Sequence, residues 1–178
     1  RIDADGLTVS DKPEFIGTIN CVDGVEVYIT NQKGGISCYN FTKSGPSNAY
    51  KFVSSKILYK DMHTQRLGEA LFMEGADTAD DLNPLVLDGV TSVILSGGEG
   101  EDTYSITEHT RKKLKKIIVN NYASDKAKDR LELYVKNINE TVLLRKDDDL
   151  FFNDQEGVVS LRNVFGDHKM DHNHLEVF

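Results

Sequence analysis

Residues 97–105 read Gly-Gly-Glu-Gly-Glu-Asp-Thr-Tyr-Ser and fit the nonapeptide pattern G-G-x-G-x-D-x-U-x, with Tyr104 at the apolar position. Glycines adopt positive φ angles at little cost, so this sequence favours a tight turn with exposed carbonyl groups, and Asp102 adds a charged oxygen. The residues after Asp102 are typical of a short strand. The stretch therefore predicts a turn that leads into a β-strand.

Short apolar or alternating segments, separated by Gly, Asn and Asp, occupy most of the chain on both sides of this turn. Their lengths and β-branched content indicate strands. The expected strands are residues 7–9, 15–19, 25–30, 36–41, 49–53, 56–59, 117–119, 131–135, 142–145, 150–152, 158–165 and 175–178, with two more within 85–95. The expected fold class is all-β, or β-rich with one or two short helices. A β-solenoid or β-roll is the favoured architecture, and a β-sandwich is the alternative.

Two segments depart from the strand pattern. Residues 61–73 place apolar side chains on one helical face, although Gly68 weakens that helix. Residues 108–116 are basic and span one to two helical turns, which we interpret as a solvated face or exposed turn. The acidic, loop-like residues 74–84 suggest a boundary between a β-rich segment, 1–80, and a roll-like segment, 81–178, which could also pack as one domain.

A single glycine-aspartate turn supplies about half of the six to eight oxygens that calcium takes, so a second turn must complete any site. Residues 74–81, about 22 positions upstream of the nonapeptide, form a degenerate relative of it. The candidate calcium ligands, taken over both turns, are Gly97, Gly98, Gly100, Asp102, Asp77 and Asp80. The alternative is an acidic surface loop beside a purely architectural turn.

The nonapeptide and the segments after it resemble the end of an RTX-type calcium-binding repeat protein. The matching pieces are GGEGEDTYSI, IIVNNYASDKAKDRLEL, VLLRKDDDLFF, VVSLRNVF and HLEVF, within roughly residues 85–178. The resemblance implies a parallel β-roll that continues into a capping β segment, with calcium as the cofactor. Glu101 departs from the Asn or Asp common at its position in that family.

Several features favour a secreted protein. The sequons Asn40-Phe41-Thr42 and Asn139-Glu140-Thr141 are candidate glycosylation sites, and Cys21 and Cys38 are close enough in sequence to form a disulfide, with two free thiols as the alternative. The net charge of −8 argues against a nucleic-acid partner, and no apolar run is long enough to insert into a membrane. Because the chain begins at Arg1, we expect a piece of a longer precursor.

The remaining polar clusters are interpreted structurally. Residues 147–149, three consecutive aspartates, suit a hairpin turn, and His168, His172 and His174 suit a polar turn rather than a transition-metal site. The chain contains no recognisable catalytic motif, so we do not expect an enzyme.

Together these features predict an extracellular structural or cell-adhesion module that is calcium-stabilised and glycosylated. Its expected partners are copies of itself, in a homo-oligomer that could close into a ring, other domains of its precursor, and glycans. This combination resembles the ring-forming core subunits of sponge aggregation factors, which are proteoglycan-like adhesion assemblies. The alternatives are the C-terminal calcium-binding portion of a secreted bacterial RTX toxin or adhesin, and an enzyme or carbohydrate-binding domain on a β scaffold.

Overall fold

The structure is a computed structural model that describes residues 14–30, 35–46, 49–121, 125, 127–165 and 174–178. Strands account for most of these residues, and the all-β expectation is confirmed. The chain divides into two compact units, Arg1–Gln65 and Arg66–Phe178. This division replaces the one expected at residues 80 and 81, which would cut through the first coil of the second unit.

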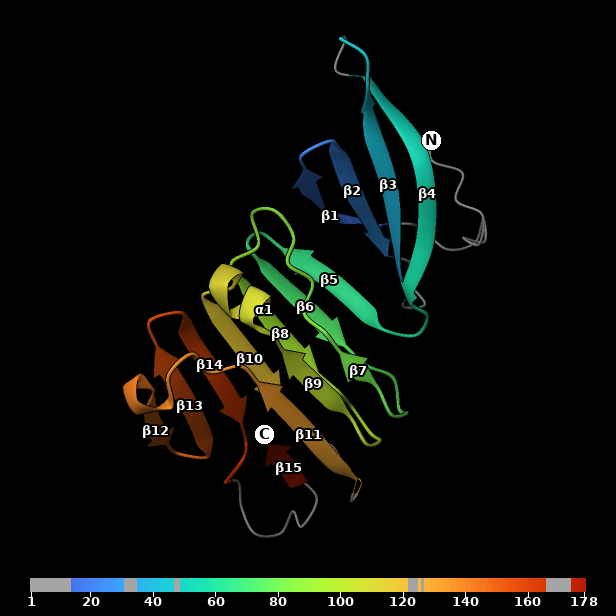
Figure 1. Cartoon of the computed structure of the whole chain (residues 1–178). Coiled ribbons are helices and arrows are strands. Elements are labelled where there is room, and N and C mark those ends of the chain that lie inside the picture. The colour runs from blue at the N-terminus through green and yellow to red at the C-terminus, as the bar shows by residue number, and fades with distance from the viewer. Residues whose placement is uncertain (1–13, 31–34, 47–48, 122–124, 126, 166–173) are drawn as a thin grey trace. The chain divides into compact units, whose positions relative to one another are not determined.

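The first unit contains one antiparallel sheet in the order β1-β2-β3-β4 (Figure 1). Its strands are β1 (Glu14–Cys21), β2 (Gly24–Thr30), β3 (Ile36–Ser44) and β4 (Ala49–Tyr59). The segments 49–53 and 56–59, expected as two strands, form the single strand β4. Its register against β3 shifts twice, so β4 is irregular rather than flat.

The segment expected as a helix over 61–73 forms two strands instead, β5 (His63–Leu67) and β6 (Ala70–Glu74). Gly68 has φ of +61° and lies in the turn between them. Leu71 and Met73 are buried while their neighbours are more exposed, which is the period of two that a strand requires. The helical periodicity of this segment was therefore misleading.

The second unit contains two sheets, with orders β12-β13-β14-β10-β8-β6-β5 and β15-β11-β9-β7. Its further elements are β7 (Asp81–Leu82), β8 (Ser92–Ser96), β9 (Thr103–Ile106), α1 (Glu108–Lys113), β10 (Lys116–Asn120), β11 (Lys128–Leu133), the 3-10 turn η1 (Ile138–Glu140), β12 (Val142–Lys146), β13 (Asp149–Asp154), β14 (Gly157–Arg162) and β15 (His174–Val177). Of the two strands expected within 85–95, β8 forms and the first does not.

From β6 to β11, successive strands of this unit alternate between the two sheets, and each pairs in parallel with its equivalent in the neighbouring coil. Thus β6, β8, β10 and β14 run parallel in one sheet, and β7, β9, β11 and β15 run parallel in the other (Figure 1). Each pair β6–β7, β8–β9, β10–β11 and β14–β15 is one coil. The architecture is that of a parallel β-roll, which we call the roll.

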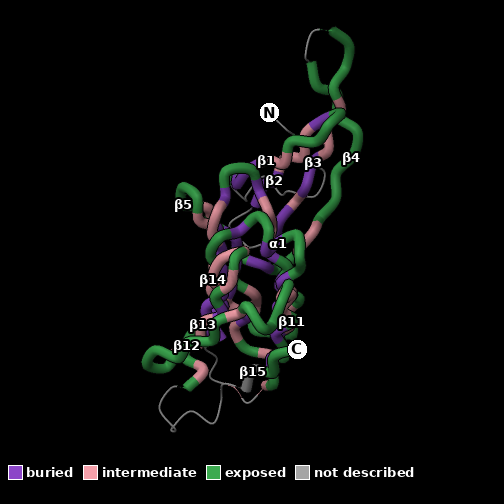
Figure 2. The backbone as a smooth tube through the Cα atoms, turned by 60° about the vertical axis from the view of Figure 1, so that its left-hand side comes forward, coloured by how far each residue is buried: buried purple, intermediate pink, exposed green. Residues whose placement is uncertain are grey.

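Equivalent apolar residues stack along the interior of the roll in rows that follow the strand registers. The rows are Leu71, Val93, Ile117 and Val159; Met73, Leu95, Val119 and Leu161; and Leu82, Tyr104 and Leu131. Every member is at most 1% exposed, and buried stretches line the strands in Figure 2. Because no single coil can bury its own apolar face, this stacking supplies the core.

Beyond β14 the seven-stranded sheet continues into the antiparallel hairpin β13–β12. Its two-residue turn consists of Asp147, with φ of +55°, and Asp148. This confirms the expectation that the acidic triplet forms a hairpin turn. Asp tolerates the left-handed conformation better than most residues, which suits it to this position.

Candidate functional site

Three buried or half-buried aspartates, one from each of three successive coils, stack where the turn of each coil meets its second strand. The following residues, Asp81, Thr103 and Arg130, lie opposite one another in the sheet, so Asp80, Asp102 and Asp129 hold equivalent positions. The Asp80 N–H donates to Asp102 Oδ1 at 3.0 Å, and the Asp102 N–H donates to Asp129 Oδ1 at 2.8 Å. We call these three residues the aspartate ladder.

Some carboxylate oxygens in and around the ladder accept hydrogen bonds, and one does not. Asp80 Oδ2 accepts from the Ala76 N–H at 2.8 Å, and Asp125 Oδ2 accepts from the Gly100 N–H at 2.6 Å. Asp102 is 1% exposed, and among the described residues its Oδ2 has no hydrogen-bond partner. A buried carboxylate oxygen without a partner is costly, so this atom is the feature of the site that requires an explanation.

The glycines of the nonapeptide allow neighbouring coils to approach this closely. A Cβ atom at Gly97 would lie 2.0 Å from Asp102 Oδ2, and the Gly97 N–H donates to the Tyr104 hydroxyl at 2.9 Å. Gly100 has φ of +113° and packs against the backbone of the preceding turn. The motif glycines are therefore required by coil packing, whether or not an ion binds.

The environment of the ladder disfavours negative charge on it. Burial first, and then the neighbouring carboxylates of Asp129, Asp80 and Asp125, raise the pKa of Asp102 to about 7, although the hydrogen bond from the Asp80 N–H lowers it in part. Burial also raises the pKa of Asp129. A cation bound at Asp102 would favour the charged carboxylate, and would therefore oppose the effects of burial and of the neighbouring carboxylates on its pKa.

We expect the free energy of unfolding in chelator to fall as pH rises between about 4 and 7. The pKa of Asp102 is near 7 when folded and near 3.9 when unfolded, so the folded state holds the extra proton in this window and loses that advantage as pH rises. Asp102 alone contributes a slope of up to about 1.4 kcal/mol per pH unit. Denaturation of wild type and Asp102→Asn at several pH values measures it, and an unchanged slope in the variant would contradict the assignment.

The structure brings together most of the expected calcium residues. Gly97, Gly98, Gly100, Asp102 and Asp80 all lie in the two adjoining turns. Asp77 is exposed in the first turn and is not part of the ladder.

Sequence reasoning missed Asp125 and Asp129, because the third turn is longer and lacks glycines. The signal that could have found Asp129 is the recurring tripeptide of Asp, any residue and a large apolar residue, which begins at Asp80, Asp102 and Asp129.

The ladder fits calcium in part. Carboxylates and turn carbonyls are the oxygen donors that calcium prefers, and Asp102 Oδ2 is free to bind it. Among the described residues, however, no three His, Cys, Asp or Glu side chains gather around one metal position. Any ion here would depend on backbone carbonyls for several of its ligands.

The two cysteines are free thiols, so the expected disulfide between them is not formed and that expectation is corrected. Cys21 is exposed at the end of β1, where it pairs with Gly24, whereas Cys38 is buried in the middle of β3 opposite Tyr28. Proximity in sequence did not bring the two sulfur atoms together because the intervening hairpin places them at different levels of the sheet.

The two sequons lie in different surroundings. Asn139 is exposed within η1. Asn40 is half-buried within β3, and its Nδ2 donates to Ser54 Oγ at 3.2 Å. Glycosylation at both asparagines stays a prediction. Of the histidine cluster, His168 and His172 lie outside the described residues, as does the side chain of His174.

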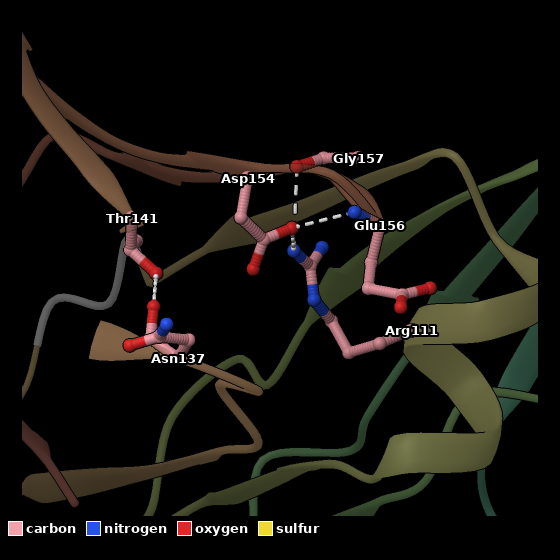
Figure 3. A network of polar contacts seen from close by, with 6 residues as sticks. All are labelled: Arg111, Asn137, Thr141, Asp154, Glu156 and Gly157. Atoms are coloured by element: carbon pink, nitrogen blue, oxygen red, sulfur yellow. Dashed lines mark hydrogen bonds and ion pairs between the residues drawn. The ribbon is translucent and has the colours of Figure 1, made fainter. Parts of the chain in front are cut away.

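A second polar cluster joins α1 to the turn between β13 and β14. The Arg111 Nη2 donates to Asp154 Oδ1 and, at 3.3 Å, to the Gly157 carbonyl, and Asp154 Oδ1 also accepts from the Glu156 N–H (Figure 3). Residues 108–113 do form the helix, and Lys112 and Lys113 are exposed as expected of a solvated basic face, whereas Arg111 is 1% exposed and is an exception to that expectation.

Comparisons with known proteins give little further information. No family model matches the chain, and no curated protein matches it. Among solved structures, the extracellular lipase LipA from Serratia marcescens is similar at a TM-score of 0.21 and 17% identity, over 85% of this chain and 29% of the lipase. The chain thus spans less than a third of that protein. None of the described helices is long and apolar enough to cross a membrane.

Proposed function

We propose that this chain is an extracellular structural module of a cell-adhesion assembly, and that calcium bound at the aspartate ladder stabilises its roll. The observation that carries the proposal is the buried, unpartnered Oδ2 of Asp102, which stands within a stack of carboxylates. A structural cation would neutralise this charge and tie adjoining turns together.

The role proposed for the ion is mechanical rather than catalytic. The ladder connects the coils at one side of the roll, where the N–H of one aspartate donates to the carboxylate of the next. An extracellular protein meets calcium concentrations that saturate sites of low affinity. The roll would therefore become fully stable after export, and glycans at Asn139 and Asn40 would be carried on the assembled surface.

We expect calcium to raise the thermal unfolding midpoint of the wild-type chain relative to chelator, because a ligand that binds the folded state alone stabilises it by RT ln(1 + [L]/Kd). At a hundredfold excess over Kd, the gain is about 2.7 kcal/mol. Circular dichroism during heating measures the midpoint, and the protein contains no Trp to follow by fluorescence.

Asp102→Asn should lose this calcium response, while Asp81→Asn, at the exposed neighbour of Asp80, should keep it. An equal response in Asp102→Asn would place the ion elsewhere. A wild-type midpoint that calcium leaves unchanged would contradict the proposal.

A further inference from the structure

Strand β12 forms one edge of the seven-stranded sheet and is exposed along its whole length. Its apolar residues Val142, Leu143 and Leu144 are 51%, 54% and 53% exposed. Leu143 lies opposite the buried Phe152, which lies opposite Val159. Leu143 therefore continues the interior row of Val159 onto the exposed edge strand. An apolar edge strand of this kind is a template for pairing with another strand.

Three of the other sheet edges in the described part of the chain, β1, β4 and β7, carry features that discourage such pairing. Strands β1 and β4 both have irregular registers, and β4 also bears Lys51 and Lys56. Strand β7 is two residues long. Irregular registers, lysines and short length are the usual ways in which proteins protect an edge. In contrast, β12 pairs with β13 in an uninterrupted register and carries its charges at one end.

The hairpin geometry shows which backbone groups of β12 point outward. Lys146 pairs with Asp149 across the two-residue turn, so this closing pair exchanges its hydrogen bonds within the hairpin. Hydrogen-bonding directions alternate along a strand, so Leu144 and Val142 also face β13. Leu143 and Arg145 therefore direct their N–H and C=O groups to the open edge.

We propose that the occupant of this edge is β12 of a second copy of the chain, paired antiparallel about a two-fold axis at Leu143. Leu143 then lies opposite Leu143 of the other copy, and the two exchange both backbone hydrogen bonds. On the opposite face of the sheet, Val142 lies opposite Leu144 in both directions. The three exposed apolar residues of each copy thus cover one another, and the two seven-stranded sheets become one.

Charge complementarity supports this register. Antiparallel pairing centred on Leu143 brings Lys146, at the end of β12 in each copy, toward Glu140 of the other copy, which lies in η1 just before that strand. The Glu140 carboxylate accepts hydrogen bonds from two neutral amides, those of Asn137 and Gln155. The two-fold axis brings this Lys and Glu together twice, and their opposite charges attract. Shifting the centre to Val142 or Leu144 would lose the match.

The inferred contact rests on the assembly part of the proposed function, and β12 is the surface through which two copies would associate. A two-fold contact is closed, so it yields dimers rather than fibres. Three residues of each β12, Val142, Leu143 and Leu144, pair with their equivalents in the other copy, so the contact buries less than the roughly 1,200 Å² of a standard stable interface. We therefore expect association in the micromolar range rather than a permanent dimer.

Sedimentation equilibrium between about 5 and 300 µM, which spans the weak affinity expected of a small interface, tests the proposal. The wild-type mass should rise with concentration from 19.9 kDa toward twice that value. Leu143→Lys places two ammonium groups opposite each other and should weaken dimerisation at least about tenfold. Lys146→Glu and Glu140→Lys each oppose like charges and should weaken it, whereas the double exchange should restore it.

Val53→Lys, at a 58% exposed position of β4, is the matched control and should leave the mass unchanged. A wild-type protein that stays at 19.9 kDa, a Leu143→Lys variant that dimerises normally, or a double exchange that fails to restore association would each overturn the inference. All measurements are made in calcium and in chelator. If the chain dimerises through β12 but shows no calcium response, this inference holds and the calcium proposal fails. If association depends on calcium but is the same in all these variants, the calcium proposal holds and this inference fails.

Discussion

Asp154→Ala is expected to lower the free energy of unfolding of the second unit by about 3 to 5 kcal/mol, because it leaves the buried guanidinium of Arg111 without its counter-charge. The Arg111 side chain is 2% exposed and that of Asp154 is 9% exposed, so water does not replace the lost carboxylate. Among the described residues, Arg111 Nε and Nη1 already lack hydrogen-bond partners. The substitution therefore isolates a charge that the fold cannot solvate.

Chemical denaturation followed by circular dichroism measures this effect. Arg162→Ala is the control, because the Arg162–Asp149 pair is more exposed and should contribute at most about 1 kcal/mol. The double variant Arg111→Met and Asp154→Asn removes both charges and keeps an acceptor for the Glu156 N–H. It should be more stable than Asp154→Ala alone, and equal destabilisation of the two would show that the charge pair is not the cause.

Gly100→Ala is expected to cost about 4 kcal/mol, from backbone strain and overpacking together. Its Cβ would lie 2.5 Å from the carbonyl carbon of Thr78 and 2.8 Å from the nitrogen of Ala79. Both atoms belong to the backbone of the neighbouring turn, so no side chain can rotate aside. The φ of +113° adds strain for any residue with a Cβ.

Gly68→Ala separates backbone strain from overpacking. Gly68 also has a positive φ, +61°, but a Cβ added there would have no atom within 4 Å. This control should cost about 1 kcal/mol. The same denaturation measurement compares the variants. Similar losses at both positions would show that coil packing at Gly100 is looser than the structure indicates.

The part of the fold that follows from local chemistry could be predicted. Short β-branched segments and Gly-Asp turns indicated an all-β chain, and the nonapeptide at 97–105 indicated a coil turn, because glycines at positive φ and a strand after the aspartate are properties of a few consecutive residues. The acidic triplet at 147–149 was interpreted correctly for the same reason.

The errors concern features that depend on what lies nearby in space. The helix expected at 61–73 became β5 and β6, because pairing of β6 with β8 outweighed a weak helical periodicity. The expected disulfide is not formed, because the registers of β1, β2 and β3 separate Cys21 from Cys38. The unit boundary lay at residues 65 and 66, since the acidic segment proved to be the turn of a coil.

The sequence by itself determined the strand content, the glycine-aspartate turn at residues 97–105 and the candidate role of Asp102 and Asp80. Only the tertiary structure decided that Asp129 completes the ladder, that Arg111 is buried against Asp154, and that β12 is an exposed edge. The physical reason is that burial, pairing and pKa arise from contacts between residues 22 to 43 positions apart, such as Asp80 with Asp102 and Arg111 with Asp154. Stacking of the coils creates those contacts, and a local pattern such as the recurring tripeptide of Asp, any residue and a large apolar residue does not show which residues meet.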